Sequence, residues 1–178
     1  MKSPAIVALH KAGIQPGPFI KHGGELSISG AALVDLSRAV FDKGIPFRFR
    51  AKGFSMSPFV KDGDTVTLAP LSHAQPFLGD IVAFVSPGTG MLVVHRVVGK
   101  GDKHFLIKGD NMPDVDGFVR RKNILGRVTR VERNGKDVFL GLGPERLLIA
   151  FLNRRSLLLP LLSPAWRIVR PIVKRLAL

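Results

Sequence analysis

Residues 47–52 read Phe-Arg-Phe-Arg-Ala-Lys, an alternation of apolar and basic side chains. Successive side chains of a β-strand point to opposite faces, so this period of two predicts a strand with one buried and one solvated face. Similar alternating or short apolar segments follow at 66–68, 81–85, 91–98, 105–107, 128–131 and 138–140. The chain therefore predicts a sheet of six or seven strands.

Turn residues separate these segments at fairly regular intervals. Gly-Asp pairs begin at Gly63, Gly79, Gly101 and Gly109, where short connections are expected. Asn134-Gly135 lies between two strand segments and predicts a hairpin, because a type I′ turn needs positive φ at both central positions. Short turns without crossover helices predict an antiparallel meander or coiled sheet.

Outside this region the pattern changes at both ends. Residues 1–24 lack a period and predict a loose arm, whereas 29–43 predict a helix with Ser29 as N-cap and Gly44 as its stop. The expected organisation is an N-terminal arm and helix (1–45), a β domain (46–143) and a basic apolar tail (144–178). The fold class is mainly β, with a coiled antiparallel sheet between one helix and an amphipathic helical tail.

The amino-acid composition limits the kinds of site and partner that the chain is expected to have. The 178 residues are 46% hydrophobic, enough for one buried core. There are no cysteines and the five histidines are scattered, so neither a disulfide nor a metal site is expected, and no cofactor. Lys and Arg number 27 against 13 Asp and Glu, a net charge of +14, which favours an anionic partner.

The C-terminal residues concentrate this charge among apolar side chains. Residues 146–178 contain no acidic residue and seven basic ones: Arg146, Arg154, Arg155, Arg167, Arg170, Lys174 and Arg175. The longest uncharged run, 156–166, is eleven residues and contains two prolines, short of the roughly 20 apolar residues that cross a bilayer. The tail is expected either to lie on an anionic membrane surface or to pack on the core.

Two further expectations concern location and partners. Residues 1–24 hold no continuous apolar run, so neither a signal peptide nor a transmembrane anchor is expected. The predicted location is peripheral on a membrane and otherwise cytoplasmic. Aromatic residues make up only 7% of the chain, tyrosine is absent, and no helix-turn-helix is visible, which disfavours nucleic acid as the partner.

The strongest chemical signal is Gly53-Phe54-Ser55-Met56-Ser57-Pro58, followed forty residues later by His95. Serine is a weak nucleophile unless a base takes its proton, and histidine is the commonest such base. Glycine before the serine and proline after it favour a rigid bend beside free backbone amides, as an oxyanion hole requires. For Ser55 the alternative is an ordinary turn, and for His95 a core histidine bonded to a backbone carbonyl.

The order of Ser55-Met56-Ser57-Pro58, His95-Arg96 and Lys108-Gly109-Asp110-Asn111 resembles that of the type I signal peptidases, over roughly residues 47–130. The similarity is closest to the archaeal and endoplasmic-reticulum branch, in which histidine stands where the bacterial enzymes have a catalytic lysine. The resemblance implies that Ser55 is the nucleophile and His95 the general base. It further implies that Asp110 or Asp116 orients the imidazole.

Asp110 is the preferred partner of His95, because it stands at the end of a strand where its geometry is fixed. Arg96, on the opposite strand face, is expected to pair with a carboxylate. The resemblance implies a serine endopeptidase that removes leader segments from precursor polypeptides with small residues near the cut. The alternatives are a self-cleaving regulator of the SOS-repressor kind and a non-catalytic basic module that binds lipid or nucleic acid.

Overall fold

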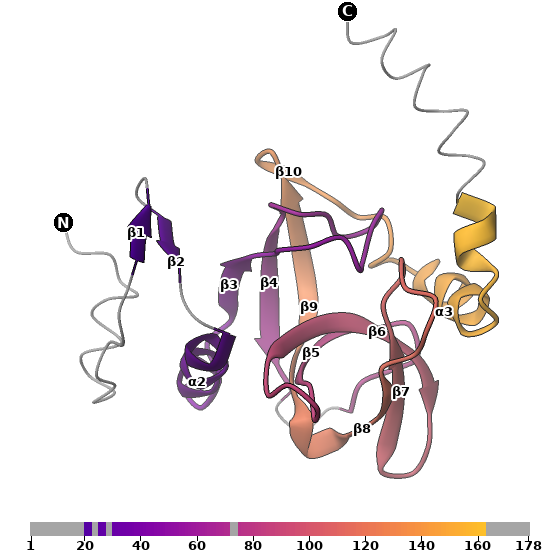
Figure 1. Cartoon of the computed structure of the whole chain (residues 1–178), viewed down its shortest axis with the longest axis horizontal. Coiled ribbons are helices and arrows are strands. Elements are labelled where there is room, and N and C mark those ends of the chain that lie inside the picture. The colour runs from indigo at the N-terminus through magenta and orange to yellow at the C-terminus, as the bar shows by residue number, and fades with distance from the viewer. Residues whose placement is uncertain (1–19, 23–24, 28–29, 72–74, 163–178) are drawn as a thin grey trace, which may run out of the picture.

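The structure is a computed structural model that describes residues 20–22, 25–27, 30–71 and 75–162. It is mainly antiparallel β-sheet with a few short helices, as the sequence predicted (Figure 1). Eight strands form one open, curled sheet, and two more form a separate hairpin. The main sheet contains β3 (Phe47–Arg50), β4 (Thr65–Pro70), β5 (Ile81–Val85), β6 (Leu92–Lys100), β7 (His104–Lys108), β8 (Gly117–Arg120), β9 (Ile124–Arg133) and β10 (Lys136–Asp137).

The strand order is β3-β4-β9-β5-β6-β7-β8, with β10 paired to β9. The sheet is therefore not a simple meander, because β9 returns across the fold and lies between β4 and β5. It pairs antiparallel with both neighbours, and each ladder contains one register shift. These shifts are expected where a sheet curls, because an unpaired residue bends its strand and increases the local twist.

The predicted strands differ from the observed ones in three places. The hairpin turn at Asn134 (φ 51°) and Gly135 (φ 75°) is present, but the strand after it is β10, and 138–140 is not a strand. β8 was not predicted. The arm predicted for 1–24 contains β1 (Ile20–His22), which pairs with β2 (Glu25–Ser27), and its first nineteen residues lie outside the described part.

Both faces of the central strands are buried, which explains their continuous apolar runs. In β5, Ile81 and Ala83 belong to one cluster, whereas Val82 and Phe84 belong to the other. The buried members of the first cluster are Leu36, Phe47, Met56, Val60, Val66, Leu68, Ile81, Ala83, Val128 and Val131. The second contains Leu71, Val82, Phe84, Val97, Phe105, Ile107, Val119 and Ile124.

Helix α2 (Gly30–Phe41) covers the first cluster and matches the predicted helix. Leu36 is buried in that cluster, with Leu33 and Val40 packed against it at helical spacing. The helix ends at Phe41, two residues before the predicted end, and the chain then turns at Gly44, whose φ of 69° is unfavourable for residues with a Cβ. Ser29, the predicted N-cap, lies outside the described residues.

Helix α3 (Arg146–Arg154) packs against β6, so the first part of the predicted tail contacts the core (Figure 1). Ile149 and Leu158 are buried in a third cluster with Phe59, which follows the candidate nucleophile by four residues. Large apolar side chains of this region also remain exposed: Leu147, Leu148, Phe151, Leu157 and Leu161. The segment therefore has one face on the core and one toward solvent, and residues 163–178 lie outside the described part.

Candidate active site

Ser55 lies in the connection between β3 and β4, on a bend held from two sides. Gly53 has a φ of 94°, and its N–H donates to the Asp62 carboxylate at 2.8 Å. On the other side, the Asn111 amide donates to the Ser55 carbonyl at 2.7 Å, and the Asn111 side chain donates to the Phe54 carbonyl at 3.1 Å. Ser55 is half-buried, so its hydroxyl is presented on a fixed backbone at the surface of the sheet.

His95 lies on β6 and brings the predicted pair together. Its Nε2 is 2.8 Å from Ser55 Oγ, and its Nδ1 is 2.6 Å from a carboxylate oxygen of Asp116. An ionised carboxylate only accepts hydrogen bonds, so Nδ1 carries the proton and Nε2 is left with a lone pair toward the serine hydroxyl. The imidazole is 6% exposed and faces the second core cluster beside Phe84. This is the geometry of a nucleophile, a base and an orienting carboxylate.

Asp110, the preferred partner from sequence, does not contact His95. Its carboxylate is fully buried and accepts the single Arg96 Nε–H, shared between its two oxygens at 2.9 and 3.1 Å, and a second hydrogen bond from Arg96 Nη2 at 2.7 Å. The Asn153 side chain of α3 donates to it at 3.0 Å. Arg96 also donates to the Gly79 and Gly141 carbonyls, which completes a buried network. The expectation that Arg96 pairs with a carboxylate therefore agrees with the structure.

The register of the strands explains why Asp110 pairs with Arg96 and not with His95. Arg96 and Lys108 are register partners on β6 and β7, so their side chains share one face of the sheet. Asp110 follows Lys108 by two residues in the turn after β7, and its hydrogen bonds with Arg96 place its carboxylate on that face, opposite to the imidazole of His95. Asp116 approaches from the other side, where its amide donates to the Ile107 carbonyl just before β8. The register of β6 against β7 was the missing information, and no local pattern supplies it.

Gly109 lies at the site, although the sequence identified it only as part of a turn and of the Lys108-Gly109-Asp110-Asn111 motif, with no role of its own. A Cβ at this position would lie 2.8 Å from the Ser55 carbonyl oxygen and 3.1 Å from His95 Nε2. Both distances are tighter than ordinary van der Waals contact, and the first involves backbone that cannot swing aside. The absence of a side chain at Gly109 therefore lets β7 approach the serine and the histidine closely.

Gly109→Ala is expected to reduce turnover by on the order of 10²-fold, because a small displacement of the reacting groups is costly. It should also lower the free energy of unfolding by about 1–3 kcal/mol through overpacking. Steady-state kinetics and chemical denaturation measure the two effects. Gly101→Ala is the matched control, because its nearest neighbour would be the His104 carbonyl at 3.6 Å. Equal activity of the two variants would show that the space at Gly109 is irrelevant.

The segment after Ser55 is held by a second ion pair. Arg133 donates to the Asp64 carboxylate from Nε at 2.9 Å and from Nη2 at 2.7 Å, and it also donates to the Phe59 carbonyl. Asp64 in turn accepts the Lys61 amide at 2.8 Å. Burial by itself raises the pKa of Asp64, but the hydrogen bonds and charge of Arg133 and the Lys61 amide outweigh it, so the pKa is lowered. This carboxylate therefore fixes the turn behind the candidate nucleophile.

Asp64→Asn is expected to lower the free energy of unfolding by about 1–3 kcal/mol at pH 7. Because folding lowers the pKa, the stabilisation is present above the pKa of an unfolded aspartate, about 3.9, and is lost as pH falls through the folded value. The difference from the original protein should therefore shrink below about pH 4. Denaturation curves across this range measure it. The control is Asp137→Asn, at an exposed ion pair with Arg130, which should lower the free energy of unfolding by under about 1 kcal/mol. If the effect of Asp64→Asn did not change with pH, the stabilising ion pair assigned to Asp64 would be contradicted.

Two backbone groups near Ser55 are available for a ligand. Within the described parts of the chain, the amides of Ser55 and Met56 donate to no acceptor. Across these same residues, no three histidine, cysteine, aspartate or glutamate side chains gather as they would around a metal ion. The arrangement is thus suited to acyl transfer, with a hydroxyl, a base and free amides at one place.

Comparison of the sequence with models of known protein families finds no match, and comparison with curated proteins finds none either.

Proposed function

We propose that this chain is a serine endopeptidase that resembles type I signal peptidases and removes leader segments from precursor polypeptides. The observation that supports the proposal is the continuous hydrogen-bonded series from Ser55 through His95 to Asp116. This series joins a half-buried serine to a buried histidine that lies 40 residues away in the chain. The distances between their atoms are those expected for proton transfer. The mainly antiparallel, curled sheet around it is a second observation in support of the proposal.

The proposed reaction proceeds in two steps. Ser55 Oγ attacks the scissile carbonyl carbon while its proton moves to His95 Nε2, and the resulting tetrahedral intermediate expels the amine, which takes that proton. Water then attacks the acyl-enzyme, with His95 again accepting a proton and returning it to Ser55. Asp116 remains ionised throughout and stabilises the imidazolium. The free amides of Ser55 and Met56 supply hydrogen bonds to the oxyanion, in agreement with the expected backbone oxyanion hole.

An extended substrate fits the open edge of β6 beside His95. Residues Leu92, Val93 and Val94 pair with β5 on one side, whereas the β6–β7 ladder begins only at Arg96. A polypeptide added to the unpaired edge would place its backbone next to the histidine, with alternate side chains directed toward the sheet. The preference for small residues near the cut is what the resemblance implies.

Contact with an anionic membrane surface belongs to the same proposal. The solvent-facing side of α3 exposes Leu147, Leu148 and Phe151, and Arg154 and Arg155 follow at its end. Apolar and cationic side chains together suit the interface of an acidic bilayer. In the part of the chain that the structure describes, none of the helices has the length and apolar character needed to cross a membrane.

The test is incubation of the purified chain with a panel of extended leader-like peptides that carry alanine or glycine beside the expected cut. Mass spectrometry should find defined cleavage that stops as the medium is acidified, because protonated histidine is no longer a base. An activating group that titrates above about pH 9 would point to lysine instead. Incubation of the chain alone distinguishes the self-cleaving alternative, and the absence of any peptide cleavage would favour the non-catalytic one.

A further inference from the structure

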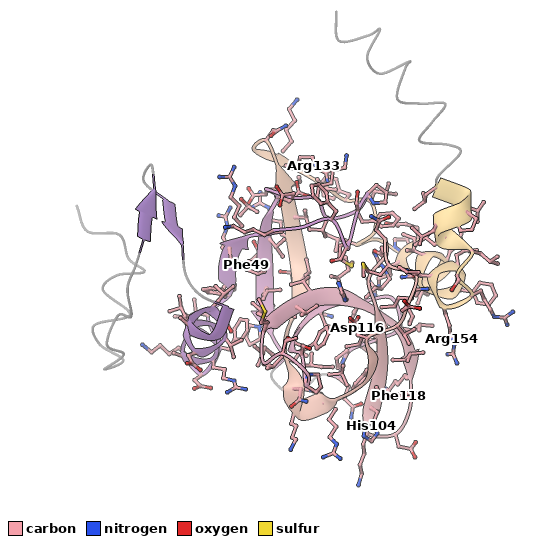
Figure 2. All side chains as sticks on the ribbon, in the orientation of Figure 1. Phe49, His104, Asp116, Phe118, Arg133 and Arg154 are labelled. Atoms are coloured by element: carbon pink, nitrogen blue, oxygen red, sulfur yellow. The ribbon has the colours of Figure 1, made fainter. Side chains whose placement is uncertain are left out.

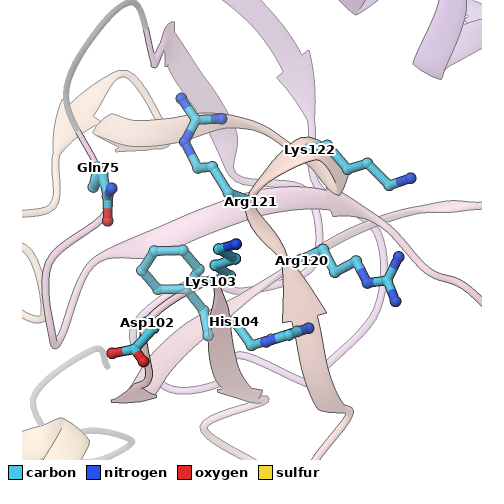
Figure 3. Close-up of a pocket in the computed structure, with 8 residues that line it drawn as sticks. Gln75, Asp102, Lys103, His104, Arg120, Arg121 and Lys122 are labelled. Carbon is cyan, nitrogen blue, oxygen red and sulfur yellow. The ribbon is translucent and has the colours of Figure 1, made fainter.

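His104 lies at the end of the β6–β7 hairpin, away from Asp116 (Figure 2). A cavity of about 490 Å³ is lined there by Lys103, His104, Arg120, Arg121 and Lys122, with Asp102 as the acidic member (Figure 3). His104 begins β7 and Gly109 directly follows its last residue, roughly 16 Å away along an extended strand. The cavity is therefore separate from the candidate active site.

The basic side chains come from neighbouring strands. His104 on β7 and Arg120 on β8 are register partners, so both side chains project from the same face of the sheet. Lys122 follows Arg120 by two residues, in the short 3₁₀ helix Arg121–Asn123. Figure 3 shows His104, Arg120 and Lys122 extending toward one side, whereas Gln75 and Asp102 lie on the other.

Within the described part of the chain, three of these cations differ from other basic residues in having no carboxylate partner. Arg96 and Arg133 pair with carboxylates elsewhere in the fold. Among the described residues, no carboxylate forms an ion pair with Lys103, Arg120 or Lys122.

Arg121 is held differently, because its guanidinium donates to the Leu71 carbonyl at 2.7 Å and to the Ile124 carbonyl at 3.4 Å. These bonds fix the segment from the end of β8 into the 3₁₀ helix, which carries Arg120 and Lys122, against the backbone of Leu71 and Ile124. Cations gathered without a counter-ion repel one another, and a bound multivalent anion would relieve that repulsion.

We propose that this cavity binds a phosphate-bearing ligand. Arg120 offers the planar fork that matches phosphate oxygens, and Lys103 and Lys122 supply point charges around it. The pocket is open to solvent, and its volume leaves room for a phosphate group of a small compound or of an anionic lipid headgroup. The proposal is independent of peptide cleavage, since none of these residues belongs to the hydrogen-bonded series at Ser55.

Binding of inorganic pyrophosphate to the full chain, followed by isothermal titration calorimetry, tests the site directly. The double variant Arg120→Gln/Lys122→Gln should bind at least about 10-fold more weakly, because it loses two charge-assisted contacts. The matched control is Arg38→Gln/Lys43→Gln, which removes the same charge from exposed positions on and just after α2. It should stay within about twofold of the original protein. Circular dichroism verifies that both variants fold.

A parallel titration uses vesicles of phosphatidylglycerol in phosphatidylcholine, with phosphatidylcholine vesicles as the blank. A loss of binding that is confined to the Arg120/Lys122 variant supports the site, whichever probe shows it. If pyrophosphate shows the loss, the ligand is a soluble phosphate compound. If only the vesicles show it, the ligand is a lipid headgroup. Equal behaviour of the two double variants, or no binding of either probe by the original protein, would overturn the proposal. Both outcomes are separable from peptide cleavage, which neither double variant should change.

Discussion

Ser55→Ala is expected to reduce kcat for peptide cleavage by on the order of 10⁴- to 10⁶-fold. Alanine removes the atom that would form the proposed acyl-enzyme, while the free amides of Ser55 and Met56 and the edge of β6 proposed for the substrate remain. Ser55 Oγ makes one side-chain hydrogen bond, to His95 at 2.8 Å, so the change should leave the fold nearly unaffected. Initial rates with a labelled leader peptide measure the effect.

The control is Ser86→Ala, a matched change in the turn after β5, which should retain full activity. His95→Ala should be as damaging as the change at Ser55, and the double variant no worse than either single one, because the two groups act as one unit. Full activity of either single variant would contradict the proposed mechanism. Additive losses in the double variant would show that serine and histidine act separately.

Asp110→Asn is expected to lower the free energy of unfolding by about 3–5 kcal/mol, which is a large part of the stability of a domain. The substitution leaves the Arg96 guanidinium buried without its counter-charge. It also weakens the acceptor of the Asn153 side chain, through which α3 contacts the β7 end. Urea denaturation measures the loss, and failure of the variant to fold at 25 °C would be its extreme form.

Asp116→Asn provides the matched comparison, because it alters the carboxylate that contacts His95. Its side chain is 28% exposed, so its removal should cost little stability. Turnover should nevertheless fall by on the order of 10²- to 10⁴-fold, because the amide no longer holds the required imidazole tautomer. A stable, inactive Asp116 variant and an unstable Asp110 variant are the expected pair. A stable but inactive Asp110 variant together with an active Asp116 variant would show that Asp110 orients His95.

Much of the fold could be predicted because its signals are local. The alternation at 47–52 and the apolar run at 81–85 depend only on which faces of a strand are buried. Asn134-Gly135 predicts its hairpin because few residues adopt positive φ twice in succession. β8 was missed because its four residues, Gly-Phe-Val-Arg, are too few to establish a period, and two of them, Phe118 and Arg120, are exposed.

The sequence by itself determined a mainly β chain, a serine on a glycine-bounded bend and a histidine within a buried strand. These follow from side-chain chemistry and backbone preferences, which act over a few residues. Only the tertiary structure decided that Asp116 and not Asp110 contacts His95, that β9 lies between β4 and β5, and that three unpaired cations line one cavity. Each of these depends on the register between strands distant in sequence, and register is set by packing of the whole core.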